Sequence, residues 1–178
     1  MSSKDLPVGT GAAVGLFGES ERSLVWTLAR KGEILVVHFS GEVDENAGLE
    51  RLRPHLEGRV VFDLEAVRRM NSAGVREWVN FVRNLPQVSE LVFERCSPTI
   101  VSQLNMIYNF RGPARVRSFY APYICEHCDV DVDVLLDVDT HFPDRDPAKV
   151  PPFQCPKCGR PLTFDDIPER YFAFVVQL

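Results

Sequence analysis

Long hydrophobic runs are missing from this sequence. No apolar stretch among its 178 residues approaches the about 20 residues that a helix needs to cross a bilayer. The beginning of the chain also lacks the charged, apolar and cleavage-site regions of a secretory signal peptide. We therefore expect a cytoplasmic protein without a membrane partner.

An excess of positive charge is missing as well. The chain has 20 Lys and Arg against 25 Asp and Glu, which gives a net charge of -5. Proteins that bind nucleic acids hold the phosphates mainly with basic side chains, so no nucleic-acid partner is expected. Disorder of the whole chain is excluded, because 45% of the residues are hydrophobic and can fill a core.

Composition divides the chain near Ser118. The part up to Ser118 has 15 Lys and Arg against 14 Asp and Glu, whereas the rest has 5 against 11. This difference predicts two domains, residues 21–118 and 119–178, after a flexible leader over residues 1–20. The Gly9-Thr10-Gly11 stretch of the leader is not a phosphate loop, because no strand precedes it and no Lys-Ser or Lys-Thr follows it.

Strand and helix patterns alternate through the first domain. Runs rich in β-branched and aromatic residues predict strands over residues 24–30, 33–40, 59–64 and 90–94. Apolar residues at helical spacing predict helices over residues 46–56, after Asn71-Ser72 and after Ser97-Pro98. Helices that alternate with strands imply a partly parallel sheet covered by helices, which is an α/β fold.

One segment makes the first domain more specific. Residues 60–85 contain an apolar strand that ends in Asp63-Leu64, a loop, and then Asn71-Ser72-Ala73-Gly74 at the start of a helix. This segment resembles the STAS domain of bacterial anti-sigma factor antagonists, and the element order over residues 24–118 agrees with it. The family usually has Asp before the serine, where this chain has Asn71. The resemblance implies a STAS-like mixed sheet with helices packed on it.

The resemblance also implies a function in signal transduction without enzymatic activity. In partner-switching members, an anti-sigma kinase-like protein binds the unmodified serine and releases the phosphorylated one, which makes Ser72 the expected phosphorylation site. The expected partner contacts are Asn71, Ser72, Gly74 and Arg76. Gly74 would let the backbone of a partner approach, and the neighbouring Arg68 and Arg69 would join Arg76 in holding an acidic face or the added phosphate.

Chemistry at a helix start supports such a switch. Unpaired backbone N–H groups and the positive end of the helix dipole can hold a phosphate on Ser72 without unfolding the helix. Three alternatives stay open. In the first, Ser72 serves only as a helix N-cap, worth about 1 kcal/mol. In the second, Ser72 is a nucleophile, although a Gly-x-Ser-x-Gly context is absent. In the third, the domain is a constitutive scaffold of a larger complex. We expect no catalytic residues.

Four of the five cysteines form two Cys-x-x-Cys pairs. Cys125 and Cys128 are separated by 26 residues from Cys155 and Cys158, and a glycine follows the second pair. Four thiolates close a tetrahedral shell, so the pattern resembles a zinc ribbon with structural zinc. Disulfides are the main alternative. Iron in a rubredoxin-like electron carrier is a minor one, since Asp129 stands where rubredoxin normally has glycine.

The remaining cysteine and the histidine inside the first pair have other expected roles. Cys96 has no partner in this scheme and is predicted to be a packed thiol. His127 lies between two ligands of a complete shell, so we expect it near the metal or on the surface rather than as a ligand.

The last sixty residues contain two further patterns. Residues 129–139 alternate between valine or leucine and aspartate, except at Leu135, which predicts one strand with an acidic face. This face is either solvated or meets a basic protein surface. It is not a calcium loop, because Val134 and Thr140 stand where such a loop needs Gly and Glu. Residues 171–177 predict a closing strand that packs against the first domain. The sequence leaves the oligomeric state open.

Overall fold

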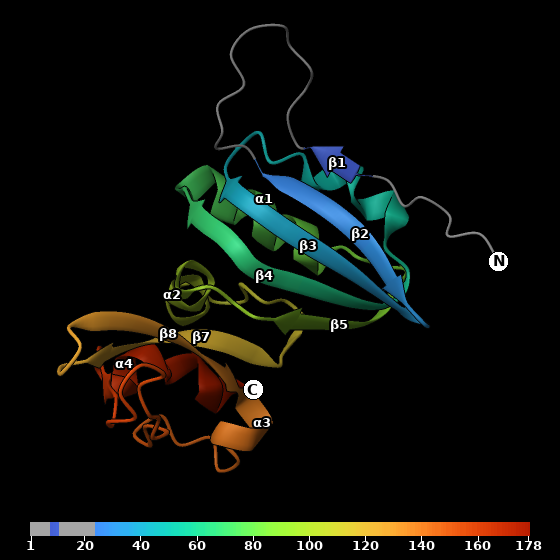
Figure 1. Cartoon of the computed structure of the whole chain (residues 1–178). Coiled ribbons are helices and arrows are strands. Elements are labelled where there is room, and N and C mark those ends of the chain that lie inside the picture. Colours follow the sequence, from blue (N-terminus) through green and yellow to red (C-terminus); the bar gives the residue numbers. More distant parts are fainter. Residues whose placement is uncertain (1–7, 11–23) are drawn as a thin grey trace, which may run out of the picture.

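The computed structural model describes residues 8–10 and 24–178 of the chain (Figure 1). Most of the predicted leader, residues 1–7 and 11–20, lies outside the described residues. The remaining part of it, β1 (Val8–Thr10), pairs antiparallel with β2 (Val25–Lys31). Within the described residues, none of the helices has the length and apolar character that spanning a bilayer requires.

The larger sheet has six strands in sequence order, β1 to β6. The further strands are β3 (Ile34–Val43), β4 (Gly58–Met70), β5 (Val88–Glu94) and β6 (Arg115–Val116). β2 pairs antiparallel with both β1 and β3, whereas β3 to β6 are parallel neighbours. β2 and β3 form a hairpin, with Gly32 at a φ of 60° in the turn. The predicted α/β fold with a mixed sheet is confirmed.

Two α-helices follow the strands as predicted. α1 (Ser72–Arg83) follows β4, and α2 (Pro98–Met106) follows β5. The Ser97 side chain caps α2 by accepting a hydrogen bond from the Ile100 N–H, and Pro98 occupies the first turn. Both helices cover the same face of the sheet, as Figure 1 shows for α1 behind the strands.

The predicted helix over residues 46–56 is wrong in type. The segment forms two short 3-10 helices, η1 (Leu49–Arg51) and η2 (Arg53–His55). Pro54 has no N–H to donate to a preceding carbonyl, so an α-helix cannot run through it. The three leucines that share one face in the sequence are nevertheless all buried: Leu49, Leu52 and Leu56.

Aromatic side chains hold α1 on the sheet. Trp78 of α1 is fully buried, and its ring lies with centroid distances of 5.6 to 6.0 Å among four other rings. These are the rings of Phe39, Phe62, Phe93 and Phe110. Aromatic pairs at such distances add to the gain from burial. The core therefore fixes the position of α1 over β3, β4 and β5.

A smaller antiparallel sheet follows, with strand order β8, β7, β9. Its strands are β7 (Ser118–Cys125), β8 (Val130–Asp137) and β9 (Thr163–Phe164). Short helices complete this part of the chain: α3 (Val138–His141), α4 (Pro168–Tyr171) and η3 (Ala173–Gln177). The predicted division of the chain near Ser118 coincides with the start of β7.

The acidic strand is shorter than predicted. β8 keeps the alternation, with Asp131 and Asp133 exposed, but it ends at Asp137. The Asp137 side chain accepts a hydrogen bond from the Thr140 N–H and thereby caps α3. Asp139 consequently lies in α3, where it pairs with two arginines instead of extending the acidic face.

The predicted closing strand over residues 171–177 is wrong. This segment belongs to α4 and η3. The Asn105 side chain of α2 donates to the Tyr171 carbonyl and accepts from the Phe174 N–H, both at 2.8 Å. These contacts occupy backbone groups that a strand would need for its ladder.

The expected packing of this C-terminal segment against the first part of the chain is confirmed. Phe174 and Val175 are buried in the same hydrophobic core as Val101 and Leu104 of α2. The two sheets therefore share one core.

Gly74 lies in the first turn of α1, where the helix approaches the end of β3 closely. It is buried, and a Cβ atom built on it would lie 2.0 Å from the Val43 carbonyl oxygen. Because glycine has no side chain, the backbone at Val43 of β3 can lie directly against Gly74. This corrects the expectation that Gly74 opens space for a partner.

We expect Gly74→Ala to lower the free energy of unfolding by about 3 kcal/mol, because α1 must move off the Val43 carbonyl. Gly32→Ala is the control, since it has open space and only a left-handed φ of 60°. That substitution should cost about 1 kcal/mol. Urea unfolding of both variants measures the difference. Equal losses would show that the close approach has no energetic consequence.

Candidate metal centre and serine turn

The four paired cysteines come together in space. Cys125 ends β7, Cys128 follows it in a turn, and Cys155 and Cys158 lie in the loop before β9. Their four sulfur atoms all lie within 4.8 Å of one another. The Cys125 and Cys158 sulfurs are 3.6 Å apart. The chain therefore gathers one cluster from two segments.

This cluster suits a metal ion. A tetrahedral shell with metal–sulfur bonds of about 2.3 Å places its sulfurs about 3.8 Å apart. The sulfur separations here agree with that geometry, so the four cysteines can hold a metal ion. All five cysteines of the chain are free thiols rather than disulfides.

The backbone of the second pair is folded around the sulfur of Cys155. The Gly159 N–H donates to the Cys155 carbonyl at 2.9 Å, and Gly159 has a left-handed φ of 71°. Burial alone would raise the pKa of Cys155, but hydrogen bonds from the Lys157 and Cys158 backbone lower this pKa to about 7. A thiol that ionises easily is a ready metal ligand, because thiolates bind metals.

The first pair reaches the same turn without glycine. Asp129 follows Cys128 with a φ of 50°, the left-handed conformation that Gly159 has after the second pair. Aspartate is one of the few residues with a side chain that adopt it readily. A hydrogen bond with Cys158 raises the pKa of Cys128 to about 12, so the metal-free cluster resists full ionisation.

The other two residues near this pattern lie where the sequence predicts. His127 is exposed and is not part of the sulfur cluster. Cys96 is fully buried between β5 and α2, and burial raises the pKa of its thiol. Cys96 is therefore a packed thiol.

At the start of α1, one residue caps the helix and its neighbour is exposed to solvent. Asn71 caps α1: its side-chain oxygen accepts a hydrogen bond from the Gly74 N–H at 2.7 Å, and its amide donates to Glu45 at 2.9 Å. The pKa of Glu45 is lowered, chiefly by this bond. Ser72 is exposed and is the first residue of α1. The alternative in which Ser72 serves only as the N-cap is therefore wrong.

Three arginines are close to this turn in the sequence. Arg68, Arg69 and Arg76 are all exposed. Within the part of the chain that the structure describes, none of them forms an ion pair with Asp or Glu. The end of β4 is held by α2, because Ser97 and Thr99 donate hydrogen bonds to the Val67 and Arg68 carbonyls. Ser72 thus follows a supported strand end that carries exposed arginines, with the acidic Glu45 bound to the neighbouring Asn71.

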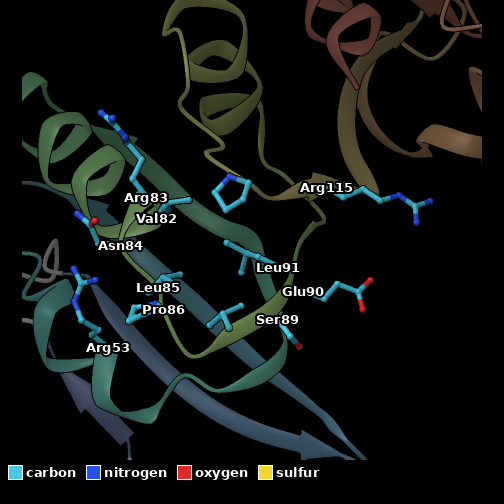
Figure 2. A pocket seen from close by; sticks show the side chains of 12 residues that line it. Arg53, Val82, Arg83, Asn84, Leu85, Pro86, Ser89, Glu90, Leu91 and Arg115 are labelled. Carbon is cyan, nitrogen blue, oxygen red and sulfur yellow. The ribbon is translucent and has the colours of Figure 1, made fainter.

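A cavity lies at the other end of α1. Its volume is about 640 Å³, and its floor is apolar, with Val82, Leu85 and Leu91. Figure 2 shows that Arg83 and Arg115 point away from this floor. Since its charged groups do not converge, the cavity lacks the arrangement that orients a small ligand.

Sequence reasoning missed a polar cluster on the face of the sheet that the helices leave free. Asp63, His38 and Arg95 meet there, and Asp63 is 5% exposed. The available signal was a charged residue inside the apolar residues 60–64 and a histidine inside the apolar run before Ser40. A charge buried in a strand needs a partner from elsewhere in the chain.

A scan against protein-family models finds no match to this chain, and a search of curated proteins finds none either. The likeness to STAS domains therefore rests on residues 60–85 and on the order of the elements.

We expect Cys158→Ser to lower the affinity of the full chain for its metal at least about tenfold. Cys158 is exposed, so its loss removes a ligand without leaving a buried cavity. Cys96→Ala is the control and should retain the metal, because Cys96 lies outside the cluster. Metal analysis after dialysis against a chelator measures both. Retention of the metal by Cys158→Ser would exclude the four-sulfur site.

Proposed function

We propose that this protein is a non-enzymatic regulator of the anti-sigma factor antagonist type, which switches protein partners through Ser72. The observation that carries the proposal is that the cap and the exposed hydroxyl at the start of α1 belong to two different residues. Asn71 caps the helix, and Ser72 is exposed beside it. Its hydroxyl is therefore available to a kinase, and its modification would leave the cap in place.

The charges around Ser72 support a switch. A phosphate on Ser72 would add about -1.5 to -2 charges near neutral pH. The exposed Arg68, Arg69 and Arg76 lie within four residues of Ser72 along the chain and are candidates to hold it, while Glu45 is bound to the neighbouring Asn71. An acidic partner surface that binds these arginines would then be repelled by the phosphate, or would compete with it. Phosphorylation would change the surface and leave the fold intact.

For the cysteine cluster we propose structural zinc. Four thiolates complete a tetrahedral shell and leave no open position for a substrate. Such a site stabilises the segments that carry its ligands, here the end of β7 and the loop before β9. Iron in a rubredoxin-like carrier is the alternative for the same four sulfurs.

The metal identity has a direct test. Protein purified without added metal should contain about one zinc ion per chain and should be colourless. An iron site with four thiolates would absorb visible light and lose its colour on reduction. Metal analysis with an absorption spectrum distinguishes the two, and a coloured, reducible protein would overturn the proposal of zinc.

The switch is tested with the tagged full chain and a partner captured from native lysate in the presence and absence of ATP. Ser72→Ala should bind that partner like the wild type, whereas Ser72→Glu should weaken binding at least about tenfold, since it places a negative charge among the arginines. Calorimetry or a binding sensor measures the affinities. Ser102→Glu, an exposed serine of α2, is the matched control and should bind normally.

Two outcomes would contradict switching. Equal affinity of the wild type and both Ser72 variants would remove Ser72 from the interface. Stable co-purification with a large complex, with Ser72 never phosphorylated, would instead favour a constitutive scaffold.

A further inference from the structure

The sheet face opposite α1 and α2 has its own pocket. Val36, Val61 and Val92 pack together on this face, separately from the main core. The pocket beside them has a volume of about 400 Å³, within the range of small-ligand sites. Its polar lining comes from four strands and the residues that follow them: Lys31, His38, Asp63, Glu94, Arg95 and Arg117.

Asp63 and His38 form a fixed pair at this pocket. The His38 Nδ1 lies 2.5 Å from a carboxylate oxygen of Asp63. Burial alone would raise the pKa of Asp63, but hydrogen bonds from Arg95 and His38 outweigh it and lower the pKa. An ionised carboxylate can only accept, so Nδ1 must donate its proton to Asp63. In the neutral form of the ring, the free electron pair is then on Nε2.

Arg95 keeps this arrangement in place. Its guanidinium donates to both oxygens of Asp63 and lies 2.6 Å from Glu65. Its backbone has a φ of 49°, a conformation that residues with side chains rarely adopt. The Arg95 N–H donates to the Ser118 hydroxyl at 2.9 Å, which anchors that conformation. Such backbone strain concentrates at functional sites.

Two cations of the pocket retain donors for a ligand. Arg117 gives one nitrogen to Glu94. Lys31 forms no ion pair among residues 24–178. Asp63 and Glu65 are already paired with Arg95. The groups that remain for a ligand are thus an imidazole nitrogen, the Lys31 ammonium and the guanidinium nitrogens of Arg117 that Glu94 leaves unbound, and such donors suit a phosphoryl group.

We propose that His38 Nε2 is a phosphoryl-accepting nucleophile for a small phosphoryl donor of the phosphoramidate or acyl phosphate class. The Nε2 electron pair forms a bond to phosphorus while the bond from phosphorus to the leaving group breaks. With phosphoramidate, whose nitrogen already carries the proton near neutral pH, the nitrogen leaves as ammonia; with an acyl phosphate, the carboxylate leaves. The Nδ1 proton stays on the ring and keeps its hydrogen bond to the ionised Asp63, whose negative charge balances the positive ring, and Arg117 and Lys31 face the phosphoryl oxygens.

This site is separate from Ser72, which opens α1 on another part of the surface. A phosphate on histidine is lost in acid, whereas one on serine survives. The two proposals therefore fail independently.

The test incubates the metal-loaded full chain with phosphoramidate and follows each histidine by mass spectrometry under neutral conditions. His55 and His127 are internal controls, because both are exposed and neither is paired with a carboxylate in the structure. His38 should be modified at least about tenfold faster than either. His38→Gln should lose the acid-labile label, and Ser72→Ala should keep it.

Two variants separate the roles of the neighbours. Asp63→Asn should slow modification of His38 about tenfold, because the ring loses the carboxylate that orients it. Arg117→Gln leaves the pair intact and should slow modification through weaker phosphoryl binding, so it serves if Asp63→Asn fails to fold. Modification of His38 no faster than His55 and His127 in the wild type would overturn the proposal.

Discussion

The seating of α1 on the sheet is the constraint on which the rest of this structure depends. Gly74 lets the first turn of the helix pack against the Val43 carbonyl. Trp78, in the next turn, packs among the aromatic rings of the core. Any shift of α1 would move Asn71 away from Glu45 and would displace Ser72. The exposed serine is thus placed by a buried contact a few residues along the chain.

The second sheet is bound to this frame through α2 and the end of β5. Cys96 bridges to Phe119 of β7, and Asn105 holds the turn between α4 and η3. Phe119, Phe172 and Phe174 continue the hydrophobic core across the junction. A metal that fixes the loop of Cys155 and Cys158 against the end of β7 would therefore stabilise a part of the chain that also supports α2.

Much of the fold could be predicted because its signals are local. The apolar runs of β3 to β5, the cap at Ser97 and the spacing of the four cysteines lie within short windows. The wrong predictions share a cause. Residues 171–177 have a strand-like composition, but Asn105, far away in the sequence, takes their backbone groups. A local sequence pattern contains no information about a hydrogen-bonding side chain that is distant in the sequence.

The sequence by itself determined that two Cys-x-x-Cys pairs can meet at one ion and that a serine opens an amphipathic helix, because spacing and helix periodicity fix both. Only the tertiary structure decided that Gly74 faces the protein's own backbone and that Asn71, not Ser72, is the cap. It also decided that Asp63 joins His38 and Arg95. Those outcomes depend on which distant groups arrive at each position, and that is set by packing of the whole chain.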